Sequence, residues 1–185
     1  MIVLASASPR RQELLRNAGI FFTVQPANID ETPLPGELPQ AYTERLAREK
    51  AFAVFQTHSQ DYVLGADTIV VIDECILGKP RDKEDAGRML RLLSGRTHAV
   101  ITGVCLVSAK HEQVASETTL VTMCEISDDE IQAYVSSGDP MDKAGAYGIQ
   151  GVASRWISRI EGDYSNVVGL PVSRVYSMLR QGGAF

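Results

Sequence analysis

The chain has 185 residues, a hydrophobic share of 44% and a formal net charge of −5 at pH 7, which suits a single domain over residues 1–185, or one compact two-lobed unit, with its own core. The negative charge argues against nonspecific binding of nucleic acid, which needs a basic surface. No stretch approaches the ~20 apolar residues of a membrane span and the N-terminus lacks the basic region of a signal peptide, so we expect a cytoplasmic protein that contacts no membrane.

The N-terminal segment predicts a buried strand over residues 2–5, a hydroxyl-rich turn and a helix over residues 9–18. Ser8 is placed as the N-cap and is followed by a proline, which suits the first helical turn. The unpaired N–H groups of a helix N-terminus favour anions, and Arg10 and Arg11 add forked donors that match phosphate oxygens. These features predict a phosphate site over residues 6–11; the structural alternative is an ordinary capped helix with a solvated arginine pair.

The next segment predicts a short strand over residues 20–24 and then a long loop. Four prolines between residues 25 and 39 exclude regular structure there, and this loop carries Glu31. Apolar residues recur at helical spacing over about 40–57. Lys50 lies near the middle of that helix, on a face that the pattern does not determine.

A strongly apolar run over residues 62–72 contains Gly65-Ala66-Asp67-Thr68. It predicts one long strand, or two strands broken at Gly65. An aspartate inside such a strand has to be paired, ligate a metal or lie at a cleft. A turn with two cations follows at Gly78-Lys79-Pro80-Arg81, and Asp82 is expected to cap a helix over residues 83–93.

The second half of the chain predicts a hairpin and further helices. Residues 97–108 and 113–125 are expected to form a long antiparallel hairpin, and Ser127 to open a helix with a capping box. A loop of small residues spans 142–151 and is followed by a strand over 154–160 and a last helix from Pro171. This order indicates an α/β fold with a mixed sheet. The three histidines show no ligand spacing and are expected to be structural or exposed.

The segments Ser6–Arg11, Leu46–Lys50, Gly65–Thr68, Gly78–Arg81 and Asp142–Gly151 together resemble the Maf family of nucleoside triphosphate pyrophosphatases. The string Asp-Lys-Ala-Gly-Ala-Tyr-Gly-Ile-Gln-Gly is similar to the branch that acts on dTTP and UTP, whereas the branch acting on 7-methyl-GTP has a different loop with Lys and Glu. The resemblance implies an elongated mixed β-sheet flanked by helices, in two lobes with a central cleft, as in inosine triphosphatase. It also implies hydrolysis to the monophosphate and pyrophosphate.

Cleavage between the α and β phosphates requires neutralised phosphates, a stabilised leaving group and an activated water. The family assigns the proton acceptor to the aspartate of the Gly-Ala-Asp-Thr motif, which is Asp67 here. A divalent ion, Mg²⁺ or Mn²⁺, would bind Asp67 and Glu31, with an exposed loop acid as the structural alternative for Glu31. The candidate phosphate-binding residues are Ser6, Ser8, Arg10, Arg11, Lys50 and Lys79.

The resemblance also implies that Arg10, Thr68 and Gln150 select the nucleobase. Gln150 offers both a donor and an acceptor, which suits the O4/N3 edge of uracil or thymine. Tyr147 and Trp156 are candidates for stacking on a base, with a role in the core as the alternative, favoured for Trp156.

The expected partner is therefore a nucleoside triphosphate, without nucleic acid or membrane, and a homodimer is suggested by the resemblance alone. Two alternatives to this prediction stay open. The first is a nucleotide-binding regulator of cell division with little turnover, and the second is a pyrophosphatase for another modified nucleotide such as 7-methyl-GTP.

Overall fold

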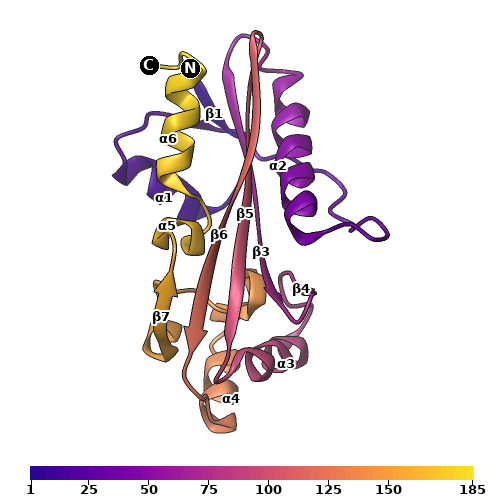
Figure 1. Ribbon diagram of the computed structural model, residues 1–185, viewed down its shortest axis with the longest axis vertical. Helices are drawn as coiled ribbons and strands as arrows, with labels where there is room; N and C mark the ends of the chain where they lie inside the picture. Colours follow the sequence, from indigo (N-terminus) through magenta and orange to yellow (C-terminus); the bar gives the residue numbers. More distant parts are fainter. The chain divides into compact units, whose positions relative to one another are not determined.

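The computed structural model describes all residues from 1 to 185 (Figure 1). The chain divides into two compact units. Unit 1 contains Met1–Asp67, Thr102–Glu117 and Gly169–Phe185, and unit 2 contains Thr68–Ile101 and Thr118–Val168. None of the helices has the length and apolar content to cross a membrane.

Seven strands and six α-helices make up the regular structure. The strands are β1 (Ile2–Leu4), β2 (Thr23–Val24), β3 (Tyr62–Ile72), β4 (Cys75–Leu77), β5 (Thr97–Ser108), β6 (His111–Met123) and β7 (Ile157–Glu161). The helices are α1 (Pro9–Asn17), α2 (Pro39–Phe55), α3 (Lys83–Leu93), α4 (Asp128–Ser136), α5 (Tyr164–Val168) and α6 (Val172–Gln181). Three 3-10 helices lie at Asp139–Asp142, Ala144–Ala146 and Val152–Trp156.

The strands pair in the order β2-β1-β3-β5-β6-β7, and β4 pairs with β3. β1 is parallel to β2 and to β3, whereas β4 runs antiparallel to β3 and β7 antiparallel to β6. The mixed sheet expected from the sequence is therefore confirmed. The boundaries between the units fall inside β3, β5 and β6, so each of these strands contributes residues to both units.

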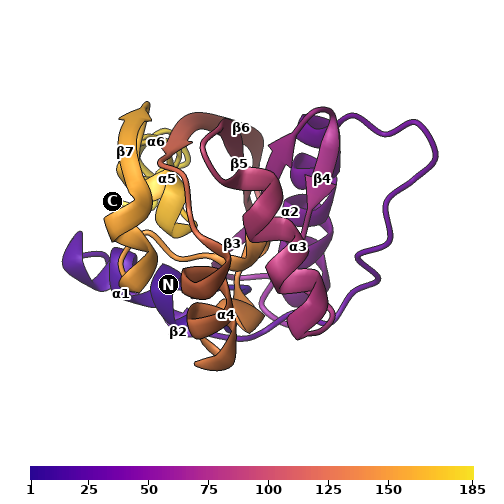
Figure 2. The same ribbon diagram turned by 90° about the horizontal axis from the view of Figure 1, so that it is seen from below.

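In unit 1, the alternation of side chains along β1 supplies two apolar layers. Ile2 and Leu4 pack in one cluster with Leu15 of α1 and Leu179 of α6. Val3 belongs to a second cluster, with residues of α2. The strands of unit 1 are thus covered by α1 and α6 on one face and by α2 on the other (Figures 1 and 2).

Two glycines let α2 lie directly against the strands of unit 1. A Cβ atom added to Gly65 of β3 would lie 2.1 Å from the carbonyl oxygen of Ala47, and one added to Gly103 of β5 would lie 2.3 Å from that of Thr43. Side chains at these positions would force the helix away. Since Lys50 follows Ala47 by one helical turn and Asp67 follows Gly65 by two residues, this close approach places Lys50 beside Asp67.

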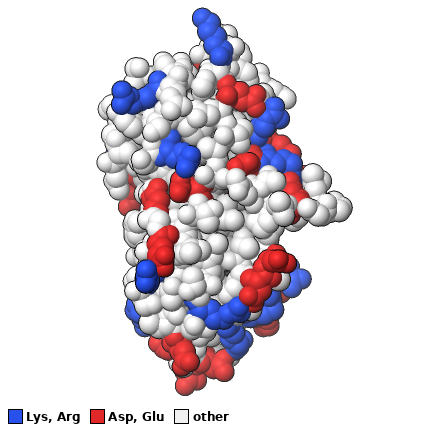
Figure 3. Space-filling view, in the orientation of Figure 1, with Lys and Arg blue, Asp and Glu red and all other residues white.

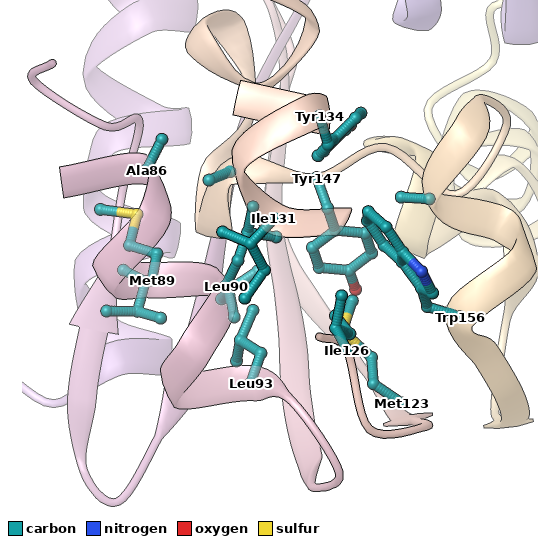
Figure 4. Packing of buried hydrophobic residues seen from close by; sticks show 14 of the residues in the cluster. Ala86, Met89, Leu90, Leu93, Met123, Ile126, Ile131, Tyr134, Tyr147 and Trp156 are labelled. Atoms are coloured by element: carbon teal, nitrogen blue, oxygen red, sulfur yellow. The ribbon is translucent and has the colours of Figure 1, made fainter. Parts of the chain in front are cut away.

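Unit 2 has its own core, shown in Figure 4. Leu90 of α3 and Ile131 of α4 pack there with the rings of Tyr134, Tyr147 and Trp156. The rings of Tyr134 and Trp156 meet edge to face, with centroids 5.3 Å apart, a favourable geometry for aromatic pairs. Trp156 therefore belongs to the core, as favoured above.

Most predicted elements are present, with some differences. Of the two alternatives for residues 62–72, the structure has the single uninterrupted strand. The strand expected over 20–24 contains only Thr23–Val24. The strand expected over 154–160 begins at Ile157, because Gly151 accepts a bond from the N–H of Ser154 and starts a 3-10 helix. The five-residue helix α5 and the three-residue strand β4 were not predicted.

Candidate active site

Three charged side chains of unit 1 converge on one point. The Nζ atom of Lys50 lies 2.7 Å from Oδ1 of Asp67 and 2.7 Å from Oε1 of Glu31. The Lys50 and Asp67 side chains are only 11% and 10% exposed, whereas the Glu31 side chain is 55% exposed. A buried ammonium and carboxylate need each other, because either charge alone is costly to bury. The structure therefore brings the expected base, the expected second carboxylate and a candidate phosphate-binding cation together.

The carboxylates of Glu31 and Asp67 have the chemistry that Mg²⁺ or Mn²⁺ requires. Both offer oxygen atoms to a common cationic centre, the ammonium of Lys50, and hard divalent ions prefer oxygen ligands. No group of three or more His, Cys, Asp or Glu side chains could hold a metal ion. Two carboxylates fit a Mg²⁺ ion that completes its coordination with water and phosphate oxygens, as is usual in nucleotide-cleaving sites.

The start of α1 is capped as the sequence predicts. Ser8 is the N-cap, and its Oγ accepts a bond of 3.4 Å from the backbone N–H of Arg11. Ser8 and Arg10 are partly exposed, whereas Ser6 is buried. In unit 1, Ser6, Ser8 and Arg10 thus belong to the same turn and first helical residues that were expected to bind phosphate.

Arg11 points inward and joins three segments of unit 1. Its Nε donates to the carbonyl of Gly169 at 2.8 Å, and its Nη1 donates to the carbonyl of Ala66 at 2.9 Å and to Oγ of Ser6 at 3.1 Å. Burial lowers the pKa of its guanidinium, an effect that the charge of Asp67 opposes. These bonds link Arg11 to the residue directly before Asp67, a role that the sequence pattern did not indicate.

The remaining predicted residues lie in unit 2. Lys79 and Gln150 are exposed and Thr68 is partly buried. The backbone N–H of Gly145 donates to the carbonyl of Gly78 at 3.0 Å, so the small-residue loop and the turn that carries Lys79 are hydrogen-bonded neighbours within this unit.

The small-residue loop contains two consecutive left-handed residues, Gly145 with φ of 68° and Ala146 with φ of 63°. This conformation is easy for glycine and disfavoured for alanine. A Cβ atom on Gly145 would also lie 2.8 Å from a methyl carbon of Val70. The loop therefore requires glycine at position 145 and holds Ala146 in a disfavoured backbone conformation.

Tyr147 anchors the same loop. Its hydroxyl lies 2.7 Å from Nε2 of His98, and the two rings meet edge to face. Burial raises the pKa of Tyr147 and lowers that of His98 to about 4, so both groups are neutral near pH 7. Tyr147 is 5% exposed and Trp156 is 3% exposed, so neither ring is available to stack on a base.

The sequence pattern did not indicate several residues that shape the site. Tyr42 of α2 donates to the carbonyl of Glu31 and Arg45 to that of Thr32, and His98 bonds to Tyr147 of the small-residue loop. The only visible signal for Arg45 was its spacing of four residues from Glu49 on the helix. Its stronger partner, Glu37, precedes the helix, where no periodic pattern applies.

Figure 3 shows basic side chains interspersed with acidic ones on the displayed face, without one continuous basic surface there. This distribution does not provide a continuous track for a long polyanion on this face.

The sequence matches the family described as Maf-like protein over residues 1–182. The dTTP/UTP pyrophosphatase of Koribacter versatilis is 59% identical over 182 residues, which cover 98% of this chain and 94% of that protein. The dTTP/UTP pyrophosphatase of Syntrophomonas wolfei is 53% identical over 182 residues, covering 97% and 96%. Among solved structures, the Staphylococcus aureus Ham1 protein is similar with a TM-score of 0.49 and 14% identity, over 84% of this chain and 79% of that chain. On the strength of the family match and the two similar pyrophosphatases, the chain belongs to the Maf family.

Proposed function

We propose that this chain is a hydrolase that cleaves dTTP and UTP, and modified pyrimidine nucleotides of the same kind, to the monophosphate and pyrophosphate. Relatives that carry the name dTTP/UTP pyrophosphatase match almost the whole chain at 53% identity or more. The structural observation that carries the proposal is the convergence of Glu31, Lys50 and Asp67 in unit 1.

Asp67 is proposed as the general base. Its side chain is held among buried strand residues and is bonded to Lys50 through Oδ1. A carboxylate accepts hydrogen bonds on both oxygens, so this bond does not prevent Oδ2 from taking a proton from the attacking water. Holding such a base in one orientation supplies part of the rate enhancement of an in-line displacement.

Lys50, Arg10, Arg11 and Lys79 are proposed to neutralise the phosphates, with Ser8 and the N-terminal N–H groups of α1 as further donors. Hydrogen bonds hold Lys50 and Arg11 in place, so little reorganisation is needed when negative charge develops on the leaving pyrophosphate. Arg10 and Lys79 are less constrained and act mainly through charge.

A divalent ion, Mg²⁺ or Mn²⁺, is proposed as the cofactor, held by Glu31 and Asp67. When bound, it supplies charge to the phosphate oxygens and lowers the pKa of a coordinated water. Lys50 would share these carboxylates with the ion while keeping its contact with Oδ1 of Asp67.

Gln150 is proposed to recognise the pyrimidine edge, with Thr68 and Arg10 as further contributors to base selection. The exposed amide of Gln150 has both donor and acceptor. The loop that carries Gln150 is anchored through Tyr147 and Gly145.

Product analysis with a panel of nucleotides tests the proposal. The purified chain is incubated with Mg²⁺ and dTTP, UTP, CTP, GTP or 7-methyl-GTP, and the products are separated by chromatography. We expect pyrophosphate and monophosphate from dTTP and UTP, and no reaction in EDTA. Release of inorganic phosphate and a diphosphate, or full activity in EDTA, would contradict the proposal.

The same panel separates the alternatives. Tight binding with negligible turnover of every nucleotide would favour a regulator of cell division, and preferential turnover of 7-methyl-GTP would favour the other modified-nucleotide enzyme. A cytoplasmic location and a homodimer stay predictions, which fractionation and sedimentation measurements test.

A further inference from the structure

Glu31 lies in a long loop that runs from β2 to α2, residues 25–38. In Figures 1 and 2 this loop extends out beside α2 and returns to the start of that helix. Most of its residues are exposed. A loop of this length without regular structure has many accessible conformations, and holding one of them costs conformational entropy. Something must therefore keep Glu31 directed at Lys50.

The contact that closes the loop is an ion pair between Arg45 of α2 and Glu37. Nε of Arg45 lies 2.6 Å from Oε1 of Glu37, and Nη2 lies 2.8 Å from Oε2. Two parallel bonds of this kind are strong and directional. The bonds from Arg45 lower the pKa of Glu37 to about 2, so the pair is charged throughout the neutral range.

Arg45 also bonds to the backbone next to Glu31. Its Nη2 donates to the carbonyl of Thr32 at 3.2 Å. The residue before Glu31 also contacts Thr32. Oδ1 of Asp30 accepts bonds from the N–H of Thr32 at 2.9 Å and from its hydroxyl at 2.6 Å. The residues before and after Glu31 are therefore tied to each other and to α2.

Tyr42 holds the peptide of Glu31 itself. Its hydroxyl donates to the carbonyl of Glu31 at 2.7 Å. Tyr42 is buried, and burial raises the pKa of its hydroxyl to about 12, so the donor stays protonated. The guanidinium of Arg45 lies over the Tyr42 ring, 5.5 Å from its centroid, and this contact joins the two residues into one unit.

From these contacts we infer that Arg45, together with Tyr42, is a positioning residue that directs the carboxylate of Glu31 toward the point shared by Lys50 and Asp67. The inference rests on the proposed function, in which Glu31 is a metal ligand. Arg45 does not touch the ion or the nucleotide. It acts through the loop backbone, and α2 carries both Arg45 and Lys50, so one helix sets the positions of Lys50 and of the Glu31 that faces it.

Binding of Mn²⁺ in the absence of nucleotide, measured by electron paramagnetic resonance titration, tests the inference independently of turnover. The variants are Glu31→Gln, Arg45→Gln and Tyr42→Phe. Arg48→Gln is the matched control, because Arg48 also lies on α2 and forms an ion pair of 2.6 Å, but with Glu112. Arg45→Lys keeps the charge without the fork, and thermal unfolding checks that each variant is folded.

Loss of a group that orients a metal ligand typically costs 10- to 100-fold in affinity. We expect Arg45→Gln to raise the Kd for Mn²⁺ about tenfold, Tyr42→Phe and Arg45→Lys to raise it less, and Arg48→Gln to leave it unchanged. In dTTP hydrolysis, saturating Mg²⁺ should restore most of the kcat of Arg45→Gln, which a general loss of structure would not allow.

The outcomes distinguish the positioning role of Arg45 from the metal-binding role of Glu31. If Glu31→Gln weakens Mn²⁺ binding while Arg45→Gln behaves like Arg48→Gln, the positioning role of Arg45 is wrong and the metal assignment stands. If Glu31→Gln binds Mn²⁺ as well as the parent, both the metal assignment and the positioning role are wrong. If Arg45→Gln is too unstable to study, Tyr42→Phe decides, because a Kd equal to that of Arg48→Gln overturns the inference.

Discussion

Lys50 contacts two carboxylates at once, and this determines what each of the three residues can do. Asp67 is buried, and the ammonium 2.7 Å away offsets the cost of burying its carboxylate. Glu31 is more exposed and loses less when that contact is broken, because water solvates it. Asp67 is thus the permanent partner of Lys50 and Glu31 the exchangeable one.

Replacing Asp67 by Asn keeps the side-chain volume and the acceptor for Lys50 but removes the basic oxygen. We expect Asp67→Asn to lower kcat for dTTP by roughly 10²-fold or more, in line with typical losses of a general base. Asp73→Asn, which changes an exposed aspartate paired with Arg96, serves as the control in the same steady-state assay. Near-normal turnover of a folded Asp67→Asn protein would show that the residue is structural.

Replacing Lys50 by Met should move two measurements in opposite directions. Loss of a charge-assisted phosphate contact costs about 1.5–3 kcal/mol, so kcat/KM for dTTP should fall about 10- to 100-fold. Without the competing ammonium, Glu31 and Asp67 should bind Mn²⁺ more tightly when no nucleotide is present. Weaker Mn²⁺ binding by Lys50→Met at pH 8, measured by calorimetry, would contradict the view that lysine and metal share these carboxylates.

At the scale of elements, the parts governed by local rules were predictable. The cap at Ser8 and the capping box at Ser127 depend on neighbouring residues, and the mixed sheet followed from the order of the elements. The helix expected over about 40–57 begins at Pro39, inside the segment where regular structure was excluded, because proline suits the first helical turn. The partners of Arg11 and Arg45 were not predictable, because they join segments that meet only after folding. The length of β2 was also overestimated, since two residues suffice for pairing with β1.

The approach of α2 to β3 is a second tertiary feature, and Gly65→Ala tests it. The added Cβ would lie 2.1 Å from the carbonyl of Ala47, so α2 has to move, and we expect a loss of at least about 2 kcal/mol in unfolding free energy. Because Lys50 moves with the helix, kcat should fall as well. Gly78→Ala is the control, since a Cβ there meets no atom within 4 Å. Equal stability of the two variants in urea unfolding would refute this account.

The loop that carries Gln150 is expected to control selectivity. Gln150→Ala removes a donor and an acceptor, and a base bound without them keeps unpaired polar groups, which is costly. We therefore expect kcat/KM to fall more for UTP and dTTP than for CTP or GTP, in a four-nucleotide kinetic comparison with the parent. A uniform decrease would assign Gln150 to the phosphates or the fold, with Thr68 and Arg10 as the next candidates for base selection.

At the scale of the whole molecule, each unit has a separate apolar core, and the single tryptophan, Trp156, lies in that of unit 2. Tryptophan fluorescence therefore reports on unit 2, whereas far-ultraviolet circular dichroism reports on helices of both units. Tyr147, the partner of His98, belongs to the same core as Trp156, so the fluorescence of Trp156 reports the unfolding of the core that holds this pair.

Acidification should destabilise the protein through His98. Burial lowers the pKa of His98 from 6.5 to about 4, so between these pH values the unfolded chain binds a proton at His98 and the folded chain does not. The contribution of neutral His98 to the free energy of unfolding is complete above pH 6.5 and is lost as the pH falls from 6.5 toward 4. Between pH 7 and pH 5, we expect about 2 kcal/mol less unfolding free energy.

The control for this acid effect is His98→Gln, which keeps a polar partner for Tyr147 but does not titrate. Urea unfolding followed by Trp156 fluorescence should show a clearly smaller difference between pH 7 and pH 5 for this variant than for the parent. Glu37, whose pKa is lowered to about 2, contributes its own loss only below about pH 4.5, as the carboxylate becomes protonated in the unfolded state. A pH dependence in His98→Gln equal to that of the parent would mean that other groups carry the acid sensitivity.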